Sequence, residues 1–460
     1  MSLISLPGPL MRDGRLSGKD DAITMLLYSP HITSRLQYIV GFISKELFDE
    51  PILLTSDRDE YARTAAARLN YSETAISEDD FFIRSTPLLF QSGIEPQAIG
   101  CFELNYHKAF FETTGDFPFD IFAASFYLLS RYEEYLPHAK DEYGRYAHTE
   151  SIAYREGFLN MPLVNIWLQE LKKALSRKYP ALAFRYPSFK YIPTYDIDIA
   201  YSYLHKGWKR NLGGLIRSVL KGKGRQAMER IRVLRHKRTD PFDAYEWLDS
   251  LHLYCRMKAC YFFLAAARQS GVDRNISPDS PALQELVRYH ALGYKVGAHP
   301  SWQSGDDEGL LREEIEWMEC MAERRIVRSR QHYIRFTLPQ TYRNLLKYGI
   351  EQDFSMGYGS INGFRASVAS SFYWYDLEKE TTTGLRIFPF CFMDANAFYE
   401  QKYTAGQAMN ELMHYYRLIR KVNGLMVTIW HNSFLGSDPL YAGWKDVYET
   451  FLKEEVYWDA

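Results

Sequence analysis

Residues 191–201 read YIPTYDIDIAY. The run is apolar, β-branched and aromatic, which is typical of a buried strand, yet it ends on two carboxylates, Asp196 and Asp198. Residues i and i+2 of a strand point to the same side, so both carboxylates face one space. Two nearby carboxylates repel each other unless one is protonated or a cation lies between them. The pair predicts a divalent metal, with one carboxylate as ligand and the other as base; the alternative is a strand end capped by two solvated acids.

From residue 189 onward, strand-like runs alternate with helical periods. We predict strands at 189–198, 259–265, 295–299, 326–330, 352–356, 385–392 and 425–431. The helices between them are predicted at 241–257, 281–292, 310–324, 341–348 and 406–421. Strands that alternate with helices imply a parallel sheet, and seven such strands predict an α/β fold with a closed or nearly closed βα barrel. Reactive groups of such a barrel lie at the C-terminal ends of its strands.

The first part of the chain alternates short strand-like runs with helical periods, the clearest of which is a helix at 120–135. A proline-punctuated segment at 179–189 follows, and X-Pro pairs favour extended linkers over helix. We therefore predict a smaller N-terminal α/β domain, residues 1–180, and the barrel at residues 189–460. The N-terminal domain carries no phosphate loop, and its role is left open.

Two histidines stand at other predicted strand ends. His299 lies in KVGAHPSWQS and His431 in LMVTIWHNSF, each after an apolar run. A neutral imidazole is a common metal ligand, although either residue alone is as readily a polar histidine that hydrogen-bonds beneath a loop. Three strand ends with matching chemistry make the joint functional interpretation stronger than any one residue does.

The composition sets outer limits on the function. The chain has 460 residues, a net charge of −2 and 16% aromatic residues, so it accommodates two domains and is not a general polyanion binder. Its five cysteines are odd in number and form no CxxC, which favours free thiols in a reducing compartment. Residues 1–21 lack the pattern of a signal peptide, and we expect a cytoplasmic protein.

A basic insert is predicted at about 204–240, between the first barrel strand and its helix. Residues 206–238 hold twelve Lys and Arg against one acid, Glu229. Interspersed apolar residues give the segment an amphipathic character: Leu215, Ile216, Val219 and Leu220. Such a segment contacts anionic lipid or phosphates, peripheral to the inner face of the membrane, or else it is a solvated basic helix. No nucleic-acid partner is expected, and the oligomeric state is left open.

Several stretches together resemble one known family. They are TYDID (194–198), KACYFFL (258–264), GAHPS (297–301), IRFTLP (334–339) and TIWHN (428–432). Their types and order resemble the polysaccharide deacetylase (NodB-homology) family, also called carbohydrate esterase family 4, over about residues 190–435. With its N-terminal α/β extension, the chain resembles a divergent bacterial subgroup. The resemblance implies a distorted (β/α)₇ barrel and a metal-dependent hydrolase that removes acetyl groups from sugars.

The resemblance also implies roles for single residues. Asp196 would be the general base, and Asp198 and His299 would bind the metal. Arg335 would orient the base, and His431 would be the acid that protonates the leaving group. One divalent ion is implied; a mixed histidine and carboxylate set suits zinc, and also cobalt, nickel or iron.

The sequence departs from the family pattern at two ligand positions. The carboxylates are separated by Ile197, whereas typical members have them adjacent. Gln303 stands where a typical member has a second metal-binding histidine. We predict that His332 supplies the missing imidazole, with Asp394 as a less favoured substitute. Gln303 also motivates an alternative function, a non-catalytic carbohydrate-binding protein on a degenerate deacetylase fold.

The substrate-binding candidates are Arg365, Asp353, Trp302 and Trp430. The stretch DFSMGYGSINGFRAS, 353–367, replaces the family's usual Asp-Trp segment, and its glycines predict a flexible loop over the mouth of the barrel. Arg365 would bind an anionic substrate group or form a structural salt bridge. The substrate is expected to be a carbohydrate, such as a lipid- or nucleotide-linked precursor of a surface polysaccharide.

Overall fold

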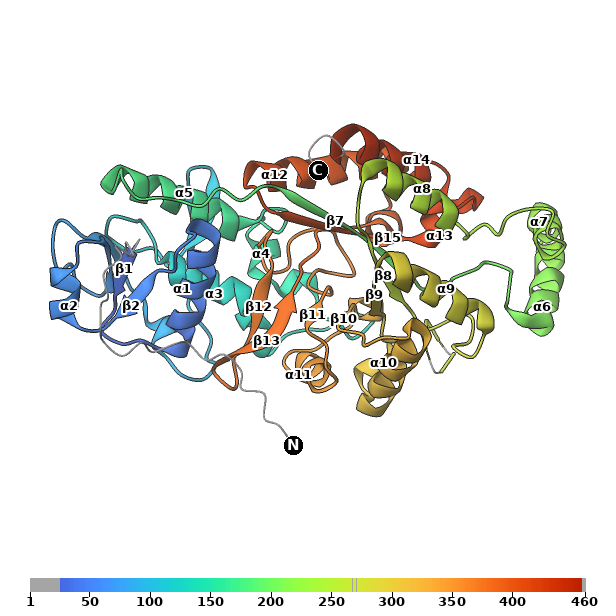
Figure 1. Cartoon of the computed structure of the whole chain (residues 1–460), viewed down its shortest axis with the longest axis horizontal. Helices are drawn as coiled ribbons and strands as arrows, with labels where there is room; N and C mark the ends of the chain where they lie inside the picture. The colour runs from blue at the N-terminus through green and yellow to red at the C-terminus, as the bar shows by residue number, and fades with distance from the viewer. Residues whose placement is uncertain (1–24, 267, 270, 457–460) are drawn as a thin grey trace.

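The computed structural model describes residues 25–266, 268–269 and 271–456 (Figure 1). Residues 1–21, on which the expectation of no signal peptide rests, lie outside this range. Within the described ranges, every helix is too short or too polar to cross a bilayer.

The N-terminal part contains a parallel sheet of four strands in the order β2-β1-β3-β4. The strands are β1 (Met25–Tyr28), β2 (Leu53–Thr55), β3 (Ala67–Ser72) and β4 (Phe81–Arg84), followed by an antiparallel hairpin of β5 (Cys101–Leu104) and β6 (His107–Phe110). The helices are α1 (Ser34–Leu47), α2 (Arg58–Arg63), α3 (Ile121–Leu129), α4 (Ile152–Arg155) and α5 (Leu163–Lys178). The helix predicted at 120–135 is shorter than expected, because Arg131 adopts a left-handed φ of 55° and a 3-10 turn follows.

The C-terminal part contains one sheet of nine strands in the order β12-β13-β11-β10-β9-β8-β7-β15-β14. The strands are β7 (Lys190–Ile197), β8 (Cys260–Phe263), β9 (Lys295–Ala298), β10 (Arg328–Ser329), β11 (Gln352–Asp353), β12 (Phe372–Asp376), β13 (Thr381–Ile387), β14 (Phe392–Met393) and β15 (Leu425–His431). The helices that accompany them are α8 (Tyr245–Cys255), α9 (Pro281–Gly293), α10 (Glu308–Ala322), α11 (Gln340–Lys347), α12 (Ala405–Lys421), α13 (Asn432–Leu435) and α14 (Trp444–Thr450). All pairs are parallel except β12–β13, so the predicted α/β class with a parallel sheet is confirmed.

One stretch of chain, residues 381–393, hydrogen-bonds to both ends of the parallel order. Its first half, β13, pairs with β11, and its second half, β14, pairs with β15. Between them, Phe388 N donates to Asp353 O at 2.8 Å and Cys391 N donates to Val427 O at 3.3 Å. The strand predicted at 385–392 is therefore two short strands joined by a bend. The antiparallel strand β12 was not predicted.

The predicted basic insert is a pair of helices, α6 (Gly207–Leu220) and α7 (Gly224–Leu234). The two helices pack on each other and lie at one end of the molecule, away from the sheet (Figure 1). The insert begins after β7 and ends before α8, so both of its connections lie at the C-terminal edge of the sheet.

The stretch 353–367 is not a flexible loop over a barrel mouth, as its glycines had suggested. All but two of its residues, Ser360 and Ile361, are buried. A Cβ at Gly357 would collide with the ring of Phe390, and one at Gly363, whose φ is +144°, would collide with Leu159 of the N-terminal part. Gly363 therefore allows close packing between the two parts of the chain, and Gly357 allows close packing within the C-terminal part.

Candidate metal centre

The strand register brings the first aspartate beside the last histidine. β7 and β15 are neighbouring parallel strands, and Asp196 is paired in register with His431. Asp198 follows β7 directly, and His299 follows β9 directly. Ionisable side chains from the ends of separate strands thus meet at the C-terminal edge of one sheet.

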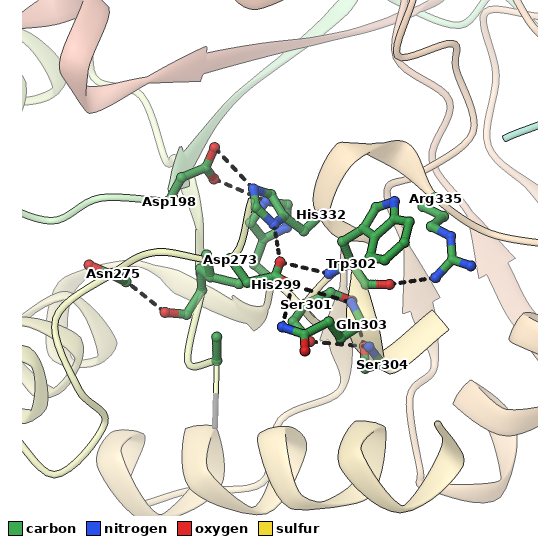
Figure 2. Close-up of polar contacts among 12 residues, drawn as sticks. Asp198, Asp273, Asn275, His299, Ser301, Trp302, Gln303, Ser304, His332 and Arg335 are labelled. Atoms are coloured by element: carbon green, nitrogen blue, oxygen red, sulfur yellow. Dashed lines mark hydrogen bonds and ion pairs between the residues drawn. The ribbon is translucent and has the colours of Figure 1, made fainter. Parts of the chain in front are cut away.

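Three of these side chains form a candidate metal site. Ligand atoms of Asp198, His299 and His332 all lie within 4.8 Å of one another (Figure 2). His299 Nε2 lies 3.1 Å from Asp198 Oδ1, and His332 Nε2 lies 3.5 Å from Asp198 Oδ2. Ligand atoms around a tetrahedral zinc are separated by roughly 3.3 Å, which is close to these distances. Asp198 Oδ1 is buried without a well-formed hydrogen bond, as expected of an atom that faces a cation.

Both histidines of the cluster are fixed from behind. His299 Nδ1 lies 2.6 Å from the carbonyl oxygen of Arg330, and His332 Nδ1 lies 2.7 Å from Asp273 Oδ1. A carbonyl or carboxylate oxygen only accepts, so each Nδ1 donates and each Nε2 can present its lone pair to the cluster. This is the usual support of metal-binding histidines in proteins. The donor set and its support fit a divalent cation.

Asp273 was not predicted, because it lies in an irregular loop after β8 with no periodic pattern around it. Its carboxylate accepts hydrogen bonds from Trp302 N at 2.8 Å and from Gln303 Nε2 at 3.0 Å (Figure 2). Gln303 stands where the resemblance implied a metal ligand. It hydrogen-bonds to the carboxylate of Asp273, which in turn hydrogen-bonds to His332. The departure at residue 303 therefore does not leave the cluster without an imidazole.

Asp196 is held by Arg330. Arg330 Nη1 donates to Asp196 Oδ1 at 2.7 Å and to Thr194 Oγ1 at 2.7 Å. The guanidinium is fully buried and its Cζ lies 4.5 Å from the centre of the Phe262 ring. The second oxygen, Asp196 Oδ2, lies 3.8 Å from His299 Nε2 and faces the cluster.

The sequence analysis predicted that Arg335 contacts Asp196. In the structure Arg330 makes this contact instead. Arg335 Nη1 donates to Trp302 O at 2.6 Å, its Nη2 pairs with Asp306, and its Cζ lies 4.1 Å from the centre of the Trp302 ring. Figure 2 shows Arg335 directed to Trp302 and away from Asp198. Arg330 follows β10 directly, whereas Arg335 follows a turn with left-handed backbone at Tyr333, φ 59°.

His431 also approaches Asp198. Its Nε2 is 3.5 Å from Asp198 Oδ2, and its Nδ1 is 2.6 Å from Asp394 Oδ1. Asp394 also accepts a hydrogen bond from His431 N at 2.7 Å, and it is fully buried. Asp394 thus orients His431 and was not predicted in this role. Asp394 contacts the Nδ1 side of the imidazole, away from the cluster. This position argues against Asp394 as a metal ligand, the less favoured alternative of the sequence analysis.

Burial and charge act against each other in the pKa values of this site. Burial alone would raise the pKa of Asp198, but the charges of His332 and His431 hold it well below its usual range. Burial would lower the pKa of His332, but Asp198 and Asp273 raise it to about 9. Burial would likewise lower the pKa of His431, but Asp394 and Asp198 raise it to about 10. The carboxylate and the imidazoles therefore stabilise each other's charged forms.

Three predicted substrate-binding residues are structural. Arg365 is buried and binds Glu134 with two hydrogen bonds of 2.8 and 2.6 Å, which is the salt-bridge alternative. Asp353 is buried, with hydrogen bonds from Ser329, Tyr342 and Ser355 that satisfy both of its oxygens.

Trp430 is the third, and it is fully buried, 4.5 Å from Tyr448 between ring centres. In β15 it alternates with His431 and points to the opposite face of the sheet, which is the face that helices cover.

Trp302 lies at the rim of the site and stays a candidate. Its indole Nε1 donates to Tyr143 O at 2.9 Å, and its ring is stacked by Arg335. Arg145 Nη1 donates to Tyr333 O at 3.1 Å. The N-terminal part therefore supports the turn that carries His332.

Comparisons with known proteins cover the two parts of the chain separately. The model of a family of unknown function (DUF7033) matches residues 25–180. No curated protein matches the sequence.

Among solved structures, a putative polysaccharide deacetylase from Mycobacterium smegmatis is similar at 13% identity, with a TM-score of 0.37, over 59% of this chain and 87% of that one. Puue allantoinase and a probable polysaccharide deacetylase from Pseudomonas aeruginosa PAO1 each give 10% identity and a TM-score of 0.36, over 58% of this chain and 83% of theirs.

Proposed function

We propose that this protein is a metal-dependent hydrolase that removes an acetyl group from an acetylated sugar or polysaccharide precursor. One observation carries the proposal. A cluster of one carboxylate and two imidazoles lies beside an Asp–Arg pair and a His–Asp pair. A ligand set, a base and an acid are the parts that metal-assisted hydrolysis of an acyl group requires.

Asp198, His299 and His332 would hold the cation, which we propose to be zinc, with cobalt, nickel or iron as alternatives. A divalent ion bound there would polarise the acyl carbonyl and lower the pKa of water. The mixed ligand set supports this assignment. So does the support of both histidines through Nδ1.

Asp196 would act as the general base. Arg330 restrains one oxygen of its carboxylate, and the other faces the cluster, where it can accept a proton from the attacking water. His431 would act as the general acid. Its Nδ1 is bound to Asp394, so its Nε2 is the atom that faces the site and can donate a proton to the leaving group.

The fold is compatible with the family that the sequence motifs resemble. If residues 381–393 are counted as one bent strand, the parallel strands of the C-terminal sheet number seven and close on themselves. This count supports the proposal of a distorted (β/α)₇ barrel. The choice of an acetylated sugar rests on the motif resemblance.

The non-catalytic alternative was motivated by Gln303. In the structure His332 provides an imidazole to the cluster and Gln303 supports it through Asp273. The described residues therefore favour an active enzyme over a degenerate binding protein.

Elemental analysis of the purified protein tests the metal site. We expect about one divalent ion per chain in the wild type, and loss of that ion in Asp198→Ala, His299→Ala and His332→Ala. His414→Ala is the matched control, because His414 is exposed on α12. Release of acetate from N-acetylated oligosaccharides should follow the metal content.

Two results would contradict the proposal. Wild-type protein that takes up no metal after incubation with zinc, cobalt, nickel or iron, and still binds sugar, would support the non-catalytic alternative. A wild type that binds metal but releases no acetate from N- or O-acetylated sugars would place the substrate in another class of amide or ester.

A further inference from the structure

The hairpin of α6 and α7 carries an exposed apolar stripe. On α6, a run of apolar side chains is between 47% and 81% exposed: Trp208, Leu212, Ile216, Val219 and Leu220. Their spacing of three or four residues places them along one side of the helix. Water-exposed apolar residues are common singly, but a continuous stripe indicates a surface that meets a partner.

The same hairpin is strongly basic. Residues 206–238 contain twelve Lys and Arg and one acid. That acid, Glu229, pairs with Arg238 at 2.9 Å within the hairpin. The exposed basic residues lie on both helices and in the turn between them, among them Lys209, Arg217 and Arg232. The partner of this surface must therefore tolerate both apolar contact and a dense positive charge.

We propose that the hairpin docks on the surface of an anionic lipid bilayer. An amphipathic helix with an aromatic and aliphatic stripe and a basic remainder lies in the plane of the membrane interface. Its apolar side chains enter the boundary between headgroups and acyl chains, and its Lys and Arg side chains meet the phosphates. An anionic bilayer therefore accounts for both the apolar stripe and the positive charge of the hairpin.

Other occupants satisfy only one property. A second copy of the chain that placed hairpin against hairpin would bring twelve cationic residues against twelve. A nucleic acid would neutralise the charge, but it would leave Leu212, Ile216 and Val219 in water, and the stripe holds one aromatic ring, Trp208, on which a base could stack.

The hairpin is anchored to the body of the protein beside the site. Asp240, at its exit, accepts hydrogen bonds from Ser202 N at 2.7 Å and Tyr203 N at 2.8 Å, at its entrance. Arg210 Nη1 donates to the backbone oxygen of Asn275 at 3.2 Å, two residues after Asp273. A docked hairpin would therefore hold the rim of the site close to the membrane.

Vesicle co-sedimentation tests the proposal with the full chain. We expect the wild type to sediment with phosphatidylcholine vesicles that contain phosphatidylglycerol, and to stay in the supernatant with phosphatidylcholine alone. The double variant Trp208→Ser/Ile216→Ser should lose binding several-fold while it keeps every charge. The control Leu253→Ser/Leu292→Ser removes two still more exposed apolar side chains from α8 and α9 and should bind as the wild type does.

The outcomes separate lipid from other polyanions. Loss of binding in Arg217→Gln/Arg232→Gln together with loss in the stripe variant supports docking through both contacts. Binding to vesicles that is unaffected by the stripe variant, and equalled by binding to single-stranded oligonucleotide, would overturn the proposal in favour of a phosphate-only surface. No binding to anionic vesicles would also overturn it.

Circular dichroism of each variant tests whether the variant is folded. Metal content reports on the site independently of the membrane. A failure of docking is thereby distinguished from a failure of the proposed hydrolase function.

Discussion

Asp196, in β7, and Asp198, directly after it, are two residues apart and differ in most of their neighbours. Asp196 meets the buried guanidinium of Arg330, while Asp198 meets the Nε2 atoms of three imidazoles. The side chain of Asp198 is 27% exposed and that of Asp196 is 2% exposed. The strand thus separates a restrained carboxylate from one that is open to a ligand.

Arg330 and Arg335 provide a matched pair for a test. Replacement of Arg330 by Gln removes the guanidinium that restrains Asp196, and we expect kcat/KM to fall by roughly 10²-fold. Arg335→Gln removes a contact with Trp302 and Asp306, and we expect a change within about threefold. Steady-state kinetics on an acetylated oligosaccharide measures both. Equal losses in the two variants, or a larger loss at Arg335, would contradict the assignment.

Asp394→Asn should affect His431 without affecting the metal. Asparagine can present its amide N–H to Nδ1 and disturb the tautomer that keeps Nε2 facing the site, so we expect kcat to fall by about 10²-fold. Metal content should stay at the wild-type value because Asp394 lies behind His431. Loss of metal in this variant would instead make Asp394 a ligand.

The residues that could be predicted are those governed by strand alternation. Asp196, Asp198, His299 and His431 follow apolar runs, and the rule for parallel sheets places them at one edge. His332 was predicted from a missing ligand. Asp273 could not be predicted, because it lies in an irregular loop and acts only through a contact that is distant in sequence.

At the level of elements, the 3-10 turn Tyr132–Tyr135 is locked to the C-terminal part by buried charges. Glu134 binds both Arg365 and Arg131, and Arg131 also donates to the backbone oxygen of Arg365. Burial would raise the pKa of Glu134, but the two arginines lower it to about 2. A carboxyl group with a depressed pKa in the folded state stabilises that state only while it is ionised.

The stability of the chain should therefore depend on Glu134 in acid. Its contribution is fully present above the ordinary pKa of a glutamate and is lost as the pH falls from about 4.5 toward 2. Glu134→Gln should lower the free energy of unfolding by about 3 kcal/mol at neutral pH. The gap between variant and wild type should narrow as the pH falls through that range.

Urea denaturation at a series of pH values measures this gap. Glu170→Gln is the control, because Glu170 pairs with Lys173 at the surface. A gap that stays constant down to pH values near 3 would contradict the assigned pKa shift.

The bounds of the strands were predicted with different accuracy. β7, β9 and β15 match the predicted strands within about two residues, because their apolar runs are long or end on Gly, Pro or His. The bend at residues 388–391 contains Pro389, which disfavours a continuous strand, but FPFC is as apolar as the strands on either side and was predicted as part of one strand. The glycines at 357 and 363 were misinterpreted, because a glycine in a sequence is equally typical of close packing and of a flexible loop.

On the scale of the whole molecule, one hydrophobic core runs through both parts. Core residues of the N-terminal part, such as Trp167 and Leu159, belong to the same contiguous cluster as Phe364 and Trp374 of the C-terminal part. The sequence predicted two separate domains. It could not predict a continuous core, since a junction formed by contacts distant in sequence has no local pattern.

We expect the full chain to unfold in a single calorimetric transition, because the two parts share this core. Residues 189–460 expressed alone should not fold stably, since the buried Arg365 and the apolar surface around Phe364 would be exposed. Differential scanning calorimetry and circular dichroism test the two statements. Two separate transitions, or a C-terminal fragment that folds and binds metal, would contradict them.

The contacts of Tyr143 with Trp302 and of Arg145 with the turn of His332 constrain how this protein can evolve. A C-terminal part that recombined with a different N-terminal part would keep the candidate metal ligands, but it would lose the contact from Arg145 that supports the turn of His332. An exchange of either part at residue 189 should therefore be tolerated only when both parts come from the same protein. The N-terminal part is, in this sense, inherited together with the candidate metal centre.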